Sequence, residues 1–186
     1  ILAVNGTLTN SSVTVHNGGT LRGTGSIPHT VTVQSGGTIS AGNSPGTLTV
    51  GTLTLQSGAI YGVEISFTAN SKTIVTGTAT FNNNTVSINM DPSGTYSSSA
   101  TYTILTYGTE VGSLNPIPID NMPGFSFTLV DDTANKQILL THQRDGMITT
   151  DLTYNSLTIA NVLNAYTGLL GAPFNSLIAL TGNALN

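Results

Sequence analysis

The chain has 186 residues with 4 Lys and Arg against 8 Asp and Glu, and only 6% of it is charged, far below the roughly 25% of an ordinary soluble domain. It contains no Cys, which excludes disulfides, zinc–thiolate sites and Cys nucleophiles. Four basic residues cannot neutralise a run of phosphates, so we expect no nucleic-acid partner. No apolar run of about 18 residues is present, so no membrane-spanning helix is predicted.

The composition indicates a folded chain. Low charge and 38% apolar residues contradict the signature of disorder, and the length suits one domain with a full core. The first methionine is Met90, and nothing before the polar repeats resembles a targeting segment, so we interpret the chain as a piece of a longer polypeptide. A neutral, Thr/Ser/Asn-rich composition without Cys is typical of bacterial surface or secreted proteins.

Three segments of the first third resemble one another. They are residues 12–23 (SVTVHNGGTLRG), 30–41 (TVTVQSGGTISA) and 52–63 (TLTLQSGAIYGV), and they start 18 and 22 residues apart. The first two are identical at six of twelve positions and the last two at five of twelve. A period of about 20 residues is typical of a solenoid, in which each repeat is one coil covered by its neighbours.

Each repeat predicts a strand, a turn and a second strand. Apolar residues alternate with Thr, as in a half-buried strand, and a Gly-Gly or Gly-Ala pair then supplies a turn that needs positive φ. Stacked repeats would align these inward residues in two columns: Val13, Val31 and Leu53, then Leu21, Ile39 and Tyr61. We therefore predict an all-β fold, a right-handed parallel β-helix. An antiparallel meander or sandwich is the alternative, but strand and turn recur in register, which favours the solenoid.

The rest of the chain divides into two further parts. Residues 66–145 contain longer alternating strands, expected to be antiparallel hairpins that cap the repeats of residues 1–65. Residues 146–186 carry a helical stripe that runs from Ile159 to Leu170 before Gly and Pro interrupt it, so a short helical segment is predicted there. Rings expected in the core of the capping part are Phe81, Tyr102, Tyr107, Phe125 and Phe127.

The sequence contains few residues in arrangements that could support catalysis. No Asp or Glu precedes Glu64, so the repeats lack the paired carboxylates of polysaccharide lyases and hydrolases. Only Asp131 and Asp132 are adjacent, and we interpret them as capping a turn rather than as a metal site. The histidines without metal-ligand spacing are His16, His29 and His142, and we expect His16 to be exposed at a strand end. We therefore predict no catalytic, cofactor-binding or metal-ligating residues, no cofactor and no enzymatic activity.

Residues 40–50, SAGNSPGTLTV, carry the most specific motif of the chain. The motif resembles "APGNSPGTLTV", the signature of the passenger-associated transport repeat of bacterial autotransporters, the type V secretion proteins. Residues 101–106 (TYTILT) resemble the "YTIL" strand of that family, and residues 127–141 resemble its closing hairpin. The resemblance covers roughly residues 6–144 in pattern.

The resemblance implies a place in the cell and a role. In this family the passenger is a long β-helix at the bacterial surface, anchored through an outer-membrane barrel at the end of the chain. The segment before the barrel, the autochaperone region, folds first and templates the coils behind it. The implied partners are the upstream passenger coils and the barrel, with no small-molecule substrate. Residues 180–185 resemble the junction before the barrel, so residues 146–186 either pack on the solenoid as a helix or thread the barrel.

The sequence leaves two functions open. The preferred one is a structural and folding module that supports secretion and surface display. The alternative is a binding surface, either an adhesin that contacts a host surface or a self-associating β-solenoid, because a ladder of Thr, Ser and Asn with little charge suits strand-to-strand or carbohydrate contact.

Overall fold

The computed structural model describes residues 1–145, and their regular structure is all β, as predicted. The strands form two sheets, of five and seven strands. The smaller sheet has the order β1 (Leu2–Ala3), β3 (Thr20–Gly23), β5 (Thr38–Ala41), β7 (Ile60–Ile65) and β9 (Thr85–Met90). The larger has the order β11 (Phe125–Asp132), β12 (Gln137–Arg144), β10 (Ser99–Val111), β8 (Lys72–Thr80), β6 (Thr47–Leu55), β4 (Ser26–Val33) and β2 (Val13–Val15).

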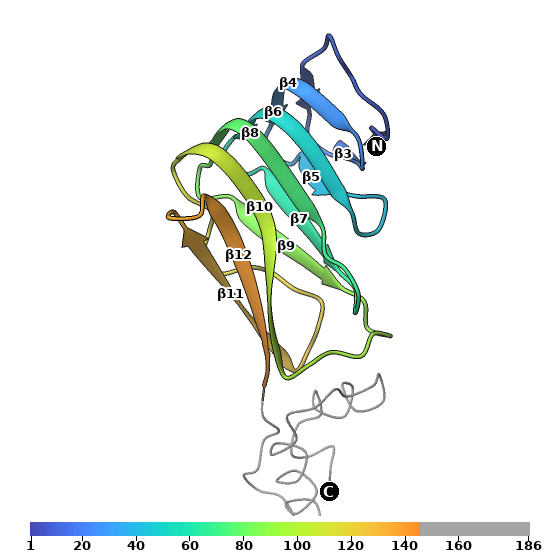
Figure 1. Ribbon diagram of the computed structural model, residues 1–186, viewed down its shortest axis with the longest axis vertical. Coiled ribbons are helices and arrows are strands. Elements are labelled where there is room, and N and C mark those ends of the chain that lie inside the picture. Colours follow the sequence, from blue (N-terminus) through green and yellow to red (C-terminus); the bar gives the residue numbers. More distant parts are fainter. Residues whose placement is uncertain (146–186) are drawn as a thin grey trace, which may run out of the picture.

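From β1 to β10 the chain alternates between the two sheets, and every strand pair in that range is parallel. Figure 1 shows the larger sheet as successive steps from the N-terminal end to β11. Val13 pairs with Val31, which in turn pairs with Leu53. The repeat in the sequence therefore predicted the correct register and the correct parallel direction.

The expected change to antiparallel pairing near residue 65 was wrong. β8 pairs parallel with β6 and with β10, and β9 pairs parallel with β7. Among the strands of residues 1–145, antiparallel ladders are confined to β12, which lies between β10 and β11. The parallel ladder continues because β8 presents apolar residues in register with the strand before it, with Val75 beside Val50 and Ala79 beside Leu53.

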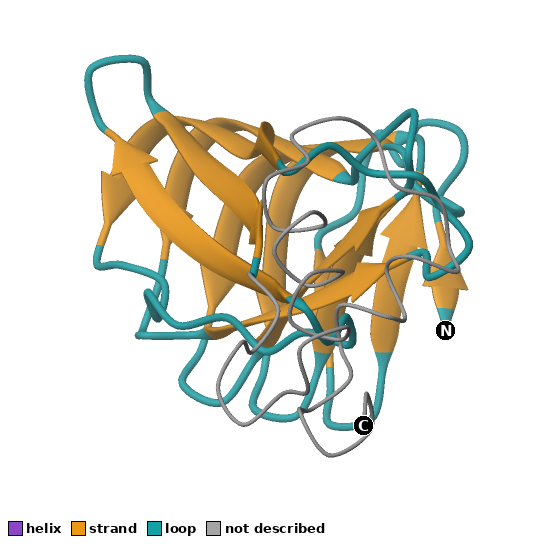
Figure 2. Cartoon of the chain, turned by 90° about the horizontal axis from the view of Figure 1, so that it is seen from below, coloured by secondary structure: helices purple, strands orange, loops and turns teal. Residues whose placement is uncertain are grey.

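The apolar core lies between the two sheets and consists of aligned columns. Leu21, Ile39, Tyr61 and Val86 are consecutive partners in the smaller sheet, and all four are fully buried. Because each repeat contributes one residue to each column, side chains of the same kind stack along the molecule and exclude water. In Figure 2 the strands form the body of the molecule and the loops lie around its rim.

The predicted turn column is also present. Gly18, Gly36 and Gly58 have φ values of 72°, 73° and 79°. Gly18 N–H donates to the Gly36 carbonyl, and Gly36 N–H donates to the Gly58 carbonyl, both at 2.9 Å. The left-handed backbone that a Gly tolerates therefore repeats along the stack, and each turn satisfies polar groups of the next.

A second column of glycines lies inside the long strands of the larger sheet, and the sequence repeat did not reveal it. The strand register shifts beside Gly51 and beside Gly108, so the long strands are irregular there. A Cβ on Gly51 would collide with the Pro28 carbonyl, and one on Gly77 would lie 2.9 Å from the Gly51 carbonyl oxygen. A Cβ on Gly108 would lie 2.8 Å from the Gly77 carbonyl oxygen. We call these residues, Gly51, Gly77 and Gly108, the bend column.

Residues 146–186, including the predicted helical stripe and the choice between a packed helix and a barrel-threading segment, lie outside the described residues. Within residues 1–145, no helix is long and apolar enough to cross a membrane.

Candidate functional site at the ends of the strand stack

The last strands of the two sheets form a closed end. In the larger sheet, β12 and β11 follow β10. In the smaller sheet the edge of β9 is covered by the segment that follows β10: Ile88 N–H donates to the Ile119 carbonyl at 2.7 Å, and Ile119 N–H donates to the Val86 carbonyl at 2.9 Å. The chain therefore uses its own backbone to satisfy the polar edge of β9.

A histidine lies at the centre of this closed end. His142 on β12 is fully buried, with Nδ1 3.0 Å from the Tyr102 hydroxyl and Nε2 3.2 Å from the Ser97 carbonyl. A carbonyl can only accept, so Nε2 carries the proton and Nδ1 accepts from Tyr102. Burial lowers the pKa of His142, opposed by the bond to Ser97, so the ring is neutral at pH 7.

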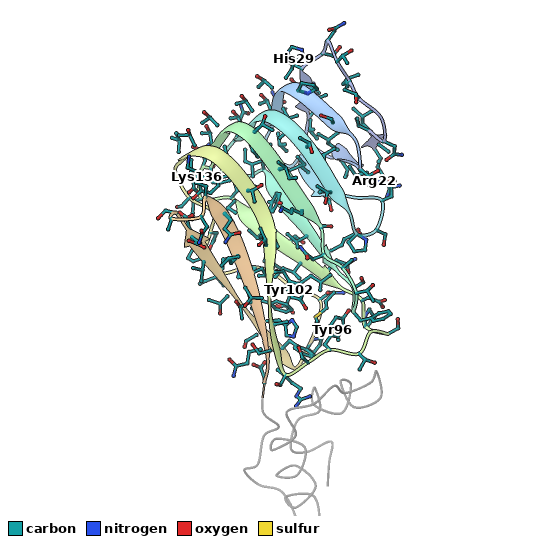
Figure 3. The ribbon with its side chains drawn as sticks, viewed as in Figure 1. Arg22, His29, Tyr96, Tyr102 and Lys136 are labelled. Carbon is teal, nitrogen blue, oxygen red and sulfur yellow. The ribbon has the colours of Figure 1, made fainter. Side chains whose placement is uncertain are left out.

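Aromatic rings surround His142. Ring centroids of Tyr96, Tyr102, Phe125 and Phe127 lie 5.3–6.4 Å from the imidazole. Figure 3 places Tyr96 and Tyr102 at the same end of β12, with Lys136 at the opposite end. Burial raises the pKa of Tyr96 and of Tyr102 to about 12, so both hydroxyls stay protonated and act as donors. The histidine is therefore a structural hydrogen-bonding centre.

The ring prediction for the capping part is confirmed. Phe81, Tyr107 and Phe125 are buried, and Tyr102 and Phe127 are partly buried against the core. The sequence placed these five rings correctly because four of them lie at apolar positions of alternating strands and Phe81 directly follows β8, in phase with its buried residues.

A buried tyrosine joins the two sheets. The Tyr61 hydroxyl, on β7, donates to the Ile104 carbonyl on β10 at 2.6 Å and lies 3.0 Å from the Thr73 hydroxyl on β8. Tyr61 is 0% exposed, and burial raises the pKa of its hydroxyl. Since the hydroxyl crosses the core to reach the opposite sheet, it fixes the spacing of the sheets near the closed end.

Two carboxyl groups that the sequence separates by 21 residues meet near the end of β10. Tyr107 donates from its hydroxyl to Asp131 Oδ1 at 2.7 Å, and Glu110 lines the same pocket of about 240 Å³ as Asp131. Glu110 Oε1 is buried without a hydrogen-bond partner. Burial and then the Asp131 carboxyl raise the pKa of Glu110 to about 7, although the Tyr107 hydroxyl opposes the shift. We call Tyr107, Glu110 and Asp131 the acid cluster.

The turn-capping interpretation of the adjacent aspartates holds for only one of them. Asp132 accepts from Asn135 N–H at 3.2 Å, from the Asn135 side-chain amide at 2.8 Å and from the Gln137 side-chain amide at 2.9 Å. These bonds, that of Gln137 first, lower the pKa of Asp132. Asp131 instead bonds to Tyr107, so the two residues face different surroundings.

A second pair of acids borders a polar pocket of about 250 Å³, where Glu64 and Asp91 lie with Asn89 and Ser66. Asp91 Oδ1 accepts from the backbone N–H of Ser93 at 2.9 Å and from its hydroxyl at 2.7 Å, and these bonds lower the pKa of Asp91. The Asp91 carboxylate is therefore occupied by its own turn and is held in the ionised state.

The other two histidines lie near the beginning of the stack. His16 is exposed at the end of β2, as expected, with Nδ1 2.6 Å from Gln34 Oε1, its counterpart in the next repeat. His29 Nε2 lies 2.8 Å from the Thr9 carbonyl. In residues 1–145, no three His, Cys, Asp or Glu residues gather closely enough to hold a metal ion.

This opposite end of the stack is open. β1 and β2 are the first strands of their sheets and have a described partner on one side only. Ile1 and Leu2 are 87% and 47% exposed, and they line a hollow of about 340 Å³ together with Val13 and Val15. One end of the stack therefore presents polar edges and apolar surface, whereas at the other end the edge of β9 is covered and β11 has a described partner on one side only.

Comparison of the chain with known protein-family models and with curated proteins finds no match.

Proposed function

We propose that this chain is the C-terminal part of an autotransporter passenger, a structural and folding module that supports secretion and surface display. In this proposal the two sheets belong to a right-handed parallel β-helix, and β10, β12, β11 and the segment covering β9 form its cap. The upstream passenger coils would pair with β1 and β2, and an outer-membrane barrel would anchor the whole protein at the bacterial surface. The GNSPG motif at residues 42–46 also supports the proposal, because it resembles the signature of the autotransporter repeat.

The main support for the proposal is the difference between the two ends of the strand stack. A β-helix coil leaves unpaired strand edges and open core at each end unless a cap covers them. The cap here covers the edge of β9 and extends the larger sheet beyond β10, while the other end exposes Ile1 and Leu2 beside the edges of β1 and β2. Such a piece can serve as a template, because a coil added at the open end finds a preformed edge and core and needs no new nucleus.

The cap also has the features of a folding nucleus. It holds the histidine–aromatic cluster, the Tyr61 bond between the sheets, and β10, the longest strand of the described part with 13 residues. Each buried ring contributes roughly 2–3 kcal/mol before entropy is counted. The coils near the open end bury smaller Val and Thr side chains, so we expect the cap to unfold last.

We assign no catalytic role to the chain. Two pairs of carboxyl groups each line one pocket, Glu64 with Asp91 and Glu110 with Asp131. Asp91 is engaged by Ser93, and Asp131 accepts from Tyr107. Each pair therefore lacks the free second carboxylate that polysaccharide hydrolysis requires.

A charge in the cap core tests the folding role. Ile104 is fully buried on β10, so Ile104→Asp should cost roughly 4 kcal/mol or more and strongly reduce display of the full-length passenger. Leu129→Asp should have a smaller effect in the same direction, because Leu129 is only partly buried. The matched control is Thr14→Asp on exposed Thr14, expected to change stability by about 0.5 kcal/mol or less.

Display is measured as cleavage of passenger by protease added to intact cells, and refolding of the purified 186-residue chain is followed in parallel. Normal display and normal refolding of the Ile104 and Leu129 variants would show that the region is a passive stalk, and the folding proposal would be abandoned.

A binding surface is the second candidate, and one feature favours it. Thr14, Thr32, Thr54 and Thr80 are consecutive partners along the outer face of the larger sheet. Such a flat row of hydroxyl and methyl groups suits an adhesin that contacts a host glycan or another strand-rich surface. Loss of cell adhesion on replacement of Thr32 and Thr54 by Lys, with display unchanged, would favour this function.

A further inference from the structure

The two sheets differ in whether the edge of the last strand is paired. The edge of β9 is covered by the chain's own residues near Ile119, whereas β11 has a partner on one side only among residues 1–145. β11 is eight residues long and pairs with β12 without a register shift. It contains no Pro and no Lys, the residues that commonly protect an edge strand from pairing. Figure 1 shows β11 at the outer margin of the larger sheet.

The backbone groups on the outer side of β11 can be identified. Asp145 N–H donates to the Gly124 carbonyl at 2.8 Å, toward β11, whereas Arg144 N–H donates to the Ser98 carbonyl at 2.7 Å, toward the β10 side. Directions alternate along a strand, so the β12 residues that bond to β11 are the odd-numbered ones. Their partners on β11 are Ser126, Thr128 and Val130. The N–H and C=O groups of Phe127, Leu129 and Asp131 therefore point away from β12.

The side chains on the core side of β11 are not completely buried. Phe127 and Leu129 pack against the core but are only partly buried. On the other face, Ser126, Thr128 and Val130 are exposed, and Val130 is 48% exposed. A further strand beside β11 would bury the remaining surface of Phe127 and Leu129 and would pair the outward backbone groups.

We propose that β11 pairs with β11 of a second copy of this chain, antiparallel about a two-fold axis at Thr128. The two seven-stranded sheets then form one continuous sheet. Phe127 lies opposite Leu129 of the second copy, and the reverse pair follows by symmetry. Thr128 lies opposite Thr128 of the second copy, and Ser126 lies opposite Val130. The acidic ends of the strands lie at opposite ends of the interface, so like charges do not meet.

The direction of the backbone groups limits the register. Outward-pointing residues must meet outward-pointing residues, so the axis passes through a residue and not between two residues. An axis at Leu129 would form a single Leu–Leu pair with Asp131 opposite half-exposed Phe127 on both sides, whereas an axis at Thr128 moves Asp131 outward, opposite Phe125, at the two ends of the pairing. An axis at Thr128 gives two Phe–Leu pairs, and it is therefore the better complement. The inference is independent of the folding role proposed above.

The chain has no Cys, so a single introduced thiol reports the register directly. In a non-hydrogen-bonded antiparallel pair the facing Cα atoms are about 4.5 Å apart, within the range of a disulfide. We expect Thr128→Cys in the full 186-residue chain to form a covalent dimer rapidly under mild oxidation with copper phenanthroline.

The matched control is Val130→Cys, which places the thiol at an exposed position of the same strand and the same face. In the proposed register the Cα atoms of residue 130 in the two copies are about four residues apart, roughly 13 Å, too far for a disulfide. A mixture of Val130→Cys with Ser126→Cys should form a heterodimer. Sedimentation of the unmodified chain should give a dimer, and Thr128→Lys should shift it to monomer without lowering its melting temperature by more than a few degrees.

A monomer at all concentrations with no oxidation of Thr128→Cys would overturn the proposal, whether the edge is then covered by downstream residues of the same chain or by nothing. Disulfide formation by the Val130→Cys variant but not by the Thr128→Cys variant would equally overturn it, because a different surface or register would then form the contact.

Discussion

Glu110 should make the closed end of the molecule sensitive to pH. Folding raises the pKa of this carboxyl from 4.5 to about 7, with burial as the main cause and Asp131 as the second. The folded state therefore favours protonated Glu110. Its contribution to stability is complete below about pH 4.5, is lost progressively as the pH rises toward 7, and is absent above that. Glu110→Gln removes this titration and keeps the shape of the side chain.

The size of the effect follows from the shift. A change from 4.5 to about 7 corresponds to roughly 3 kcal/mol at about 1.4 kcal/mol per pKa unit. Glu110 is only half-buried, so solvent screening reduces this to about 1 kcal/mol. At pH 8 the Glu110→Gln variant should therefore be about 1 kcal/mol more stable than the original chain, or roughly 2–4 °C higher in melting temperature. At pH 5 the two should be nearly equal.

The assay is thermal unfolding of both proteins between pH 5 and pH 8. Differences in melting temperature between variant and original at one pH remove the contributions of titratable groups that do not interact with Glu110. They also remove that of His142, whose lowered pKa acts in the opposite direction, toward lower stability in acid. The control is Glu64→Gln on β7. If the difference in melting temperature for Glu110→Gln is the same at pH 5 and pH 8, folding does not raise the pKa of Glu110 as described.

Two further substitutions test the hydrogen bonds of the closed end. His142→Phe keeps a ring among the aromatic residues but leaves one hydroxyl and one carbonyl without partners, so the free energy of unfolding in urea should fall by about 2–3 kcal/mol; an unchanged value would mean that water replaces the imidazole. Tyr61→Phe deprives the buried Ile104 carbonyl of its donor and should cost about 1–3 kcal/mol by the same measurement, whereas a loss under about 0.5 kcal/mol would show that the bond does not hold the sheets together.

The repeats of the first third made their part of the fold predictable. Val13, Val31 and Leu53 recur beside similar turns. The parallel direction and the register of their strands follow from the requirement that these apolar residues stack. The same reasoning failed for β8 and β9 because they continue the stack without the Gly-Gly turn that marks the earlier repeats. The parallel pairing of β8 and β9 depends on the apolar columns, and residues from distant parts of the chain form these columns.

The closed end was predictable in its rings but not in its polar contacts. Alternation shows that Tyr107 points inward, but it cannot show that Asp131 receives its hydroxyl, because β12 must first bring β11 to the edge of the sheet. Nor does any pattern distinguish His142, which is fully buried, from His16, which is exposed. The hydrogen-bond partners of His142, Tyr102 and Ser97, lie 40 and 45 residues away in the chain.

The bend column also determines where the chain can gain residues. At Gly51, Gly77 and Gly108 neighbouring backbones approach so closely that not even a methyl group fits, so an inserted residue there would displace the neighbouring strands. The connections between the sheets differ in this respect. Residues 24–25 and 42–46 contain Gly25 and Gly42, where a Cβ would also collide with neighbouring backbone, whereas residues 66–71, which join β7 to β8, contain no glycine and expose Phe67. Extra loops or whole inserted modules should therefore be tolerated at residues 66–71 and rejected at the bends and at the two crowded connections, so that variation in such a chain accumulates at one connection while the strands keep a constant spacing.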